Sequence, residues 1–376
     1  MPEGTVTATN LNLRDAPAGA ILDLLENGAS VSVLGTQGEW LRVSTTIDGQ
    51  IRLGWVSAQF VHVVAPPPAA GGGNPVPPPD DIAHPVTVQD GKAIAPDGQV
   101  FAHSFQLGFF TLGSTSLVDW LTVNPAPAGV TPSMVRTVRA CSLNEGKLEA
   151  INSYDNAFLS FGMLQWTAGT DGDAGELAAL LALLKSTDAD AFQTYFRRYG
   201  LDIRLSSAAS PTGVLLLNGT PLDSAGLKSQ LRAAPWCYRF WRAGHDDVMR
   251  RCELIHAAAR IEQFHQKHVA GLTVADWLNS EYGIALVLDE HVNRPGHVPG
   301  TLQTAIDNLP GPGDPDPANW TDVQERQLID LYIEARDNTN MTNPKLRAAN
   351  ITRCVHDGVL SAKRGSFVTA AAAPGV

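Results

Sequence analysis

Hydrophobic and polar residues alternate along the first 64 positions of the chain, and a period of two predicts short β-strands. Strand-like runs cover residues 5–9, 30–34, 39–43 and 52–56, and glycine, asparagine, aspartate and proline residues separate them. Several short strands with turn residues between them are typical of a small all-β barrel. We therefore expect residues 1–64 to form a domain of this kind.

The alternation stops at a proline-rich segment. Residues 65–85 contain eight prolines and three glycines and show no periodicity. This composition is typical of a semi-stiff, extended spacer and not of a packed element. We interpret residues 65–85 as a linker between the first domain and a second domain that covers residues 86–376.

Beyond the linker the hydrophobic spacing changes from that of strands to that of helices. Short strands are predicted at residues 86–88, 100–105 and 106–111, and a hairpin turn at Asn218-Gly219 follows residues 213–217. Helices are predicted over residues 131–141, 177–185, 245–265 and 322–336, and from residue 274 onward. Helix-start signals are Thr131 followed by proline, and capping-box patterns that begin at Asp173 and Thr321. The second domain should be mainly α with a small β portion.

Length and charge narrow the class of protein. A chain of 376 residues exceeds what one hydrophobic core usually supports, which agrees with two domains. The formal net charge of −11 argues against nucleic acid as a partner, because that binding depends on Lys and Arg neutralising phosphates. No apolar run is long enough to span a bilayer, and no phosphate-binding loop or zinc-ligand spacing occurs. We expect a monomer without cofactor or metal that binds neither membranes nor nucleic acid.

The cysteines and the N-terminal residues give information about the cellular compartment of the protein. The four cysteines are widely spaced, and we interpret them as buried thiols while leaving a disulfide open. The N-terminus has neither a basic start nor an apolar stretch, so no secretory signal is expected in this sequence.

Four short blocks stand out in the first 64 residues. Residues 11–17 read Leu-Asn-Leu-Arg-Asp-Ala-Pro, and residues 29–33, 39–43 and 54–56 follow. The order and spacing of these blocks resemble those of bacterial SH3 domains. The resemblance implies an SH3-like barrel that binds peptidoglycan, or one that mediates protein contacts. We expect Trp40 and Trp55 first as core residues, and a ligand-facing ring that binds the wall is the alternative for each.

A second resemblance is carried by residues 141–166, which read CSLNEGKLEAINSYDNAFLSFGMLQW. This segment is similar to the core of the goose-type lysozyme and lytic transglycosylase superfamily, and to muramidases of phages and type VI secretion systems. The resemblance implies a lysozyme-like fold for residues 86–376, with Glu145 as the catalytic acid. It also implies that Gln165 and the Gly162 backbone lie under the scissile sugar. Glycoside cleavage needs a carboxylic acid that stays protonated in a partly apolar pocket, which nearby aromatic residues could supply.

Other polar and aromatic residues are candidates for substrate binding. Tyr154, Ser160 and Trp166 belong to the same segment as Glu145. Asp289 and Asn293 lie four residues apart on one face of a predicted helix, and either substrate binding or a structural role would explain them.

The sequence leaves open which residue would be the second catalytic carboxylate. Thr167 occupies the position where goose-type lysozymes carry an acid, so the candidates are Glu149, Asp155, Asp171 and Asp173. Asp173 is better explained as a helix N-cap. We prefer Asp155, in the loop that begins at Asn152, as the base or water-positioning group, although aspartate also forms turns. Without a second acid the enzyme would act as a lytic transglycosylase.

The sequence therefore predicts a muramidase that cleaves the glycan backbone of peptidoglycan outside the cytoplasm. The alternatives are a lytic transglycosylase, a chitosanase or chitinase of the same fold, and a wall-binding structural protein without activity.

Overall fold

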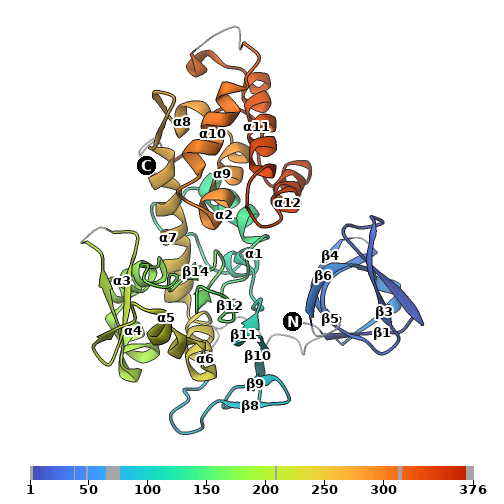
Figure 1. Ribbon diagram of the computed structural model, residues 1–376, viewed down its shortest axis with the longest axis vertical. Helices are drawn as coiled ribbons and strands as arrows, with labels where there is room; N and C mark the ends of the chain where they lie inside the picture. The colour runs from blue at the N-terminus through green and yellow to red at the C-terminus, as the bar shows by residue number, and fades with distance from the viewer. Residues whose placement is uncertain are drawn as a thin grey trace. The chain divides into compact units, whose positions relative to one another are not determined.

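The computed structural model describes residues 3–37, 39–47, 50–64, 77–207, 210–311 and 316–369. The chain divides into two compact units, Met1–Gly73 and Asn74–Val376. Each unit is described by itself below, and Figure 1 labels the elements of both.

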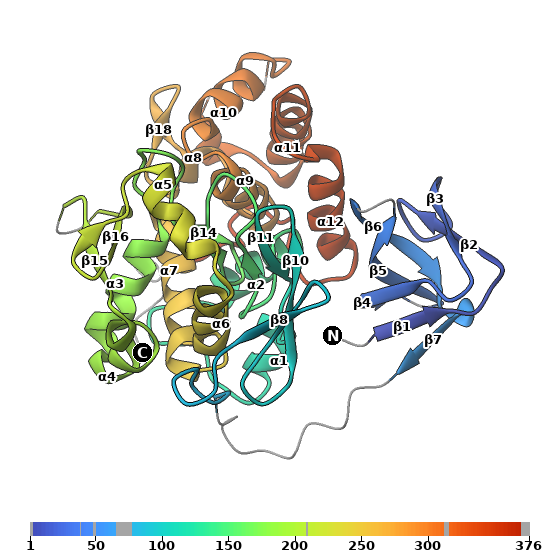
Figure 2. The same ribbon diagram turned by 60° about the horizontal axis from the view of Figure 1, so that its bottom comes forward.

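The first unit is an antiparallel β-structure. Its seven strands pair in the order β3-β2-β6-β5-β4-β1-β7, and Figure 2 shows them curling around a common centre. The strands are β1 Glu3–Val6, β2 Asn10–Arg14, β3 Ile21–Glu26, β4 Ser30–Gln37, β5 Trp40–Ile47, β6 Gln50–Ser57 and β7 Val61–Val64, with a 3₁₀ turn at Ala58–Phe60. Alternate residues of these strands face inward and form an aliphatic core: Val6, Leu11, Leu13, Leu25, Val31, Val33, Leu41, Val43, Val56 and Val61. A small β domain was predicted here, and the β structure is confirmed.

The second unit mixes helices with antiparallel strands. A seven-stranded sheet has the order β14-β13-β12-β11-β10-β9-β8. Its strands are β8 Thr87–Gln89, β9 Lys92–Ile94, β10 Val100–Phe105, β11 Gly108–Thr111, β12 Ile151–Asn152, β13 Ser160–Phe161 and β14 Trp166–Thr167. Two small sheets contain β15 Leu201–Leu205, β16 Gly213–Leu217 and β17 Thr220–Pro221, and β18 His268–Val269 and β19 Leu272–Thr273.

Among the described residues, twelve α-helices belong to the second unit. They are α1 Leu117–Leu121, α2 Pro132–Ser142, α3 Leu177–Thr187, α4 Ala189–Tyr195, α5 Ala225–Lys228, α6 Ala234–Ala243, α7 Asp247–His265, α8 Val274–Trp277, α9 Glu281–Asn293, α10 Val298–Asp307, α11 Asp322–Asp337 and α12 Pro344–His356. None of the helices in the described part of the chain is long and apolar enough to cross a membrane.

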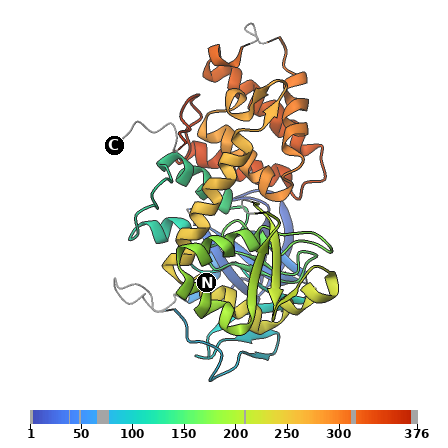
Figure 3. The same cartoon turned by 90° about the vertical axis from the view of Figure 1, so that its left-hand side faces the viewer.

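Helices α7 and α9 form the centre of the second unit. Figure 3 shows α7, in gold, running from the green part of the unit to the orange and red helices. Helix α9 is buried at every position from Glu281 to His291, and α2, α7, α11 and α12 pack against it. An acidic residue on α9 is therefore surrounded by other helices and not by solvent.

Local signals marked several element ends correctly. Thr321 and Gln324 form the predicted capping box of α11, and Asn218 and Gly219 form the predicted hairpin turn with positive φ angles. The Asp173 prediction was wrong. Helix α3 begins after Glu176, and the Asp173 carboxylate instead accepts a hydrogen bond from the Thr170 hydroxyl.

Part of the predicted linker packs against the second unit. The carbonyls of Pro78 and Pro79 accept hydrogen bonds from Arg242 at 2.5 Å and from the Tyr238 hydroxyl at 2.6 Å. Asp81 forms an ion pair with Arg239 at 2.9 Å. Residues 78–81 are therefore held by α6, whereas the earlier part of the linker, residues 65–76, lies outside the described residues.

All four cysteines are buried and unpaired, which confirms the interpretation as thiols. They are Cys141, Cys237, Cys252 and Cys354.

Candidate functional site

Glu145 lies in the turn that follows α2. Thr131 caps the start of the helix, because its hydroxyl accepts the Met134 N–H at 3.2 Å. The last carbonyl of the helix, that of Ser142, accepts the N–H groups of Glu145 and Gly146 at 3.2 Å. A carboxylate at a helix C-terminus lies at the negative end of the helix dipole. This position disfavours the charged form of Glu145.

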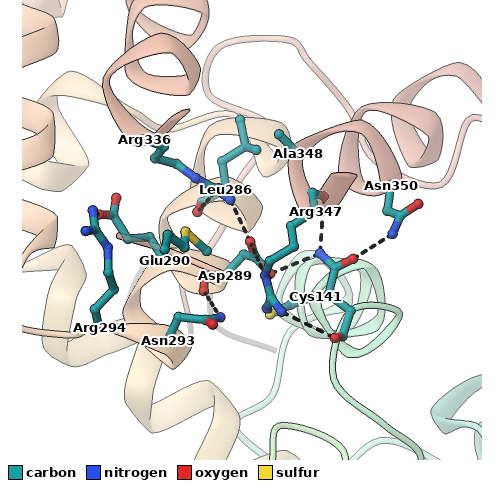
Figure 4. A network of polar contacts seen from close by, with 12 residues as sticks. Cys141, Leu286, Asp289, Glu290, Asn293, Arg294, Arg336, Arg347, Ala348 and Asn350 are labelled. Carbon is teal, nitrogen blue, oxygen red and sulfur yellow. Dashed lines mark hydrogen bonds and ion pairs between the residues drawn. The ribbon is translucent and has the colours of Figure 1, made fainter. Parts of the chain in front are cut away.

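Glu145 belongs to a network of buried and partly buried charges on four helical segments. Figure 4 shows Asp289, Arg336 and Arg347 of this network. Arg347 of α12 pairs with the Glu145 carboxylate, and the same guanidinium contacts Asp289 Oδ1 at 2.6 Å. Arg336 of α11 holds the other oxygen of Asp289 at 2.8 Å. The Asn293 amide donates to Glu145 Oε1 at 3.1 Å. The network therefore joins α2, α9, α11 and α12.

The two carboxylates of the network, Asp289 and Glu145, differ in how far they are exposed to solvent. The side chains of Asp289 and Arg336 are 0 % exposed, whereas those of Glu145 and Arg347 are 13 % and 11 % exposed. Burial raises the pKa of Glu145 above its usual range, Arg347 opposes this shift, and the negative charge of Asp289 adds to it. Glu145 thus combines a raised pKa with partial access to solvent.

The residue before Glu145 fastens the turn. Asn144 donates to Asp289 Oδ1 at 3.0 Å and to the Arg347 carbonyl at 3.2 Å. Its own side-chain oxygen accepts the Asn350 amide at 2.8 Å. These three bonds hold the turn to α9 and α12.

The residues after Glu145 meet the loop between β13 and β14. A Cβ placed on Gly146 would lie 3.5 Å from Gln165 Nε2 and 3.6 Å from the Gly162 carbonyl oxygen. The Gln165 amide in turn donates to that carbonyl at 2.9 Å. The structure thus brings Gly162 and Gln165 next to the segment that carries Glu145.

Asp155 is engaged within its own loop. Its two carboxylate oxygens accept the Asn152 amide and the Ala157 N–H, both at 2.9 Å. The ring of the adjacent Tyr154 packs edge-on against Phe105, with 4.5 Å between ring centroids. Asp155 and Glu145 share no hydrogen bond or ion pair in the described part of the chain, and the role of Asp155 as second acid stays a prediction.

The other candidates for the second acid also have structural partners. Glu149 is fully buried, and its Oε1 accepts the N–H groups of Ser114 and Thr115, each at 2.8 Å, together with both hydroxyls. Asp171 accepts the Ala225 N–H at 2.6 Å. The Glu149 carboxylate therefore organises the loop between β11 and α1.

Burial removes some predicted substrate-binding residues from direct ligand contact. Asp289, Trp166 and Ser160 are 0 %, 1 % and 3 % exposed. The Trp166 ring packs against His256 in the core, so this prediction is corrected to a packing role. The Asp289 carboxylate contacts Arg347 and Arg336. The Asn293 amide donates to Glu145 Oε1 and to the Asp289 carbonyl, and its predicted substrate binding stays a prediction.

The first unit has a surface groove beside Trp40. The guanidinium carbon of Arg14 lies 6.0 Å from the Trp40 ring centroid, a cation–π arrangement. The groove has a volume of about 350 Å³ and is lined by Ala8, Asn10, Leu11, Asn12, Arg14, Glu39, Trp40, Ser57, Gln59 and Phe60. Trp55, by contrast, is 8 % exposed and buried, which agrees with the core position expected first for it.

Comparison with known proteins assigns the first unit. Residues 9–62 match the family model of the bacterial SH3 domain. No curated protein matches the chain, and no solved structure does. The predicted SH3 resemblance is thus confirmed, and such domains typically bind peptidoglycan. The lysozyme-like resemblance of the second unit stays a prediction.

Sequence reasoning missed the two arginines of the network. Arg336 follows Leu328 and Tyr332 at intervals of four on the buried face of α11. A cation in an apolar stripe is a weak signal of a buried partner, because such a charge is costly unless it is paired. Arg347 carries the same weak signal, because it precedes Ile351 and Cys354 at helical spacing on the buried face of α12.

Proposed function

We propose that the protein is a peptidoglycan-cleaving glycosidase, with the bacterial SH3 domain as its wall-binding unit and Glu145 as its general acid. A muramidase reaction, in which water cleaves the glycan backbone, is the form that we propose first. The observation that carries this proposal is the environment of Glu145: a nearly buried carboxyl group with a raised pKa and residual exposure. A glycosidase acid must hold its proton near neutral pH and still reach the leaving oxygen.

Arg347 is placed to stabilise Glu145 after that residue has donated its proton. After Glu145 gives up its proton it becomes a carboxylate, and the guanidinium already beside it stabilises the new charge. Asp289 and Arg336 keep Arg347 in place whichever protonation state Glu145 has, because they are fully buried and bonded. The same guanidinium also favours the carboxylate before the reaction, so burial is the effect that raises the pKa of Glu145 and keeps it protonated.

Engagement of Asp155 in its loop favours a second candidate reaction. A hydrolase needs a carboxylate to activate water, whereas a lytic transglycosylase uses one acid and an internal sugar hydroxyl. Because both oxygens of Asp155 already accept hydrogen bonds, the single-acid reaction is the alternative to test.

The groove of the SH3 domain is the proposed wall contact. Aromatic, amide and charged side chains lie together there, and Trp40 offers a rigid apolar surface for a wall fragment. Binding through a shaped groove would also explain how a chain with a net charge of −11 attaches to an anionic wall.

Digestion of purified sacculi tests the proposal. Glu145→Gln keeps the shape and the hydrogen bonds of the side chain but cannot donate a proton, so activity should fall about 100- to 10,000-fold. Glu262→Gln, an exposed glutamate on α7, is the matched control and should keep full activity. In the wild type, activity should decline as the pH rises through the raised pKa of Glu145, because the protonated form is the reactive one.

The products separate the candidate reactions. New reducing ends among the released muropeptides indicate hydrolysis, and anhydro-sugar ends indicate a lytic transglycosylase. Cleavage of chitosan with intact sacculi would replace peptidoglycan as the substrate. A fully active Glu145→Gln variant would remove Glu145 from the mechanism, and the glycosidase proposal with it.

A further inference from the structure

A fully buried glutamate, Glu253, lies in the middle of α7 and holds the loop between β13 and β14. It is 0 % exposed, and its Oε2 accepts the Met163 N–H at 2.9 Å. Packing around the carboxyl group is tight: a Cβ on Gly162 would lie 2.5 Å from Oε2. Only glycine fits there, and its φ of +78° also suits glycine.

This loop is the one that meets the turn of Glu145. The Gly162 N–H donates to the Ala150 carbonyl at 2.9 Å, and the Gly162 carbonyl accepts the Gln165 N–H at 3.1 Å. Gln165, with a φ of +52°, places its amide against Gly146. The hydrogen bond between Glu253 and the Met163 N–H thus supports the turn of residues 162–165. The same turn lies against Gly146, the residue after Glu145.

The surroundings favour an uncharged carboxyl group. Burial raises the pKa of Glu253 well above its usual range, the Met163 N–H and the charge of Arg250 oppose the shift, and the negative charge of Glu149 adds to it. A neutral carboxyl group still accepts the Met163 N–H, which has no water available to replace that bond.

We propose that Glu253 is a positioning residue for Glu145: it sets the loop of residues 162–165 against Gly146 and thereby fixes the turn from which the acid projects. This inference rests on the proposed function. Glu253 itself does not touch substrate.

Two substitutions separate positioning from mere stability. Glu253→Gln retains an acceptor of the same shape, and kcat should stay within about threefold of wild type because the loop stays in place. Glu253→Leu removes the acceptor, and kcat should fall about 10- to 100-fold, since displacement of a reacting group by about 1 Å can cost that much. KM should change less than twofold, because no groove or surface residue is altered. Glu262→Leu, on the exposed face of the same helix, is the control.

Hydrogen exchange on the full chain gives a readout that does not depend on activity. In Glu253→Leu, the amides of residues 160–167 and of residues 143–148 should lose protection together, while both segments stay protected in Glu253→Gln. Loss of protection in the first segment alone would overturn the coupling. So would wild-type kcat in a folded Glu253→Leu variant.

The outcomes also distinguish this inference from the proposed function. If Glu145→Gln is inactive and Glu253→Leu is fully active, the positioning role fails and the acid stands. If Glu145→Gln is active, the acid fails whatever Glu253 does. Should Glu253→Leu not fold, the Gln variant still decides, because its inactivity would contradict a role that needs only an acceptor.

Discussion

The two units of the protein place their polar residues in opposite ways. In the bacterial SH3 domain, charged, amide and aromatic side chains line an open groove over an aliphatic core. In the second unit, Asp289, Arg336 and Glu253 are fully buried among packed helices. The polar side chains that line the groove are therefore accessible to a ligand, whereas Asp289, Arg336 and Glu253 are not.

This difference determines what a substitution measures. Surface ion pairs contribute little to stability, but removing one partner of a buried pair leaves an uncompensated charge in the core. Loss of activity in the second unit must therefore be compared with loss of stability. In the groove, binding and stability should separate cleanly.

Arg347→Met should give the largest effect on stability. It removes one of the two guanidiniums beside the fully buried Asp289, so the free energy of unfolding should fall by about 3–5 kcal/mol. Any activity that remains should extend to higher pH, because Arg347 is the group that opposes the raised pKa of Glu145. Chemical denaturation and a pH–activity profile provide the measurements.

Asp330→Asn is the surface control for that experiment. Asp330 pairs with Arg326 on the same helix as Arg336, but the two side chains are 57 % and 48 % exposed. Its loss should cost less than about 1 kcal/mol. Equal destabilisation by the two variants would show that burial does not govern the contribution of charge in this unit.

Local patterns could predict much of the fold. Alternation in residues 1–64, the Asn218-Gly219 turn and the capping box at Thr321 each depend on residues a few positions apart, and the structure has all three. Asp173 shows the limit of such signals. A side-chain bond from Thr170 competes for its carboxylate, and the helix begins after Glu176 instead.

The residues of the candidate site also differ in whether the sequence could predict them. Glu145, Gly162 and Gln165 could be named together because they belong to one short segment. Arg347, by contrast, lies 202 residues beyond Glu145, and only the packing of α12 against α9 and α2 brings it there. Long-range contacts of this kind leave no spacing in the sequence, so they could not be predicted.

Residues 78–81 allow a test of where the second unit begins. A chain that starts at residue 86 lacks the bonds from Tyr238 and Arg242 and the ion pair of Arg239 with Asp81, whereas a chain that starts at residue 77 keeps them. We expect the shorter chain to be less stable by about 2 kcal/mol, given about 1 kcal/mol for each net hydrogen bond. Thermal unfolding of the two truncated chains measures the difference. Identical melting temperatures would mean that these contacts add nothing and that the whole of residues 65–85 acts as a spacer.

The smallest effect is expected for Trp40→Ala, and it isolates the groove. Trp40 is half-buried at the groove and lies beside Arg14, so removing the ring should weaken retention on sacculi about tenfold, equivalent to about 1.4 kcal/mol. The measurement is pelleting with insoluble sacculi, made in the Glu145→Gln background so that the wall is not digested. Leu24→Ser is the control, because Leu24 is 52 % exposed on β3 and does not line the groove. It should leave retention unchanged. If Leu24→Ser weakens retention and Trp40→Ala does not, the wall contacts the β3 side of the domain, and the groove has another use.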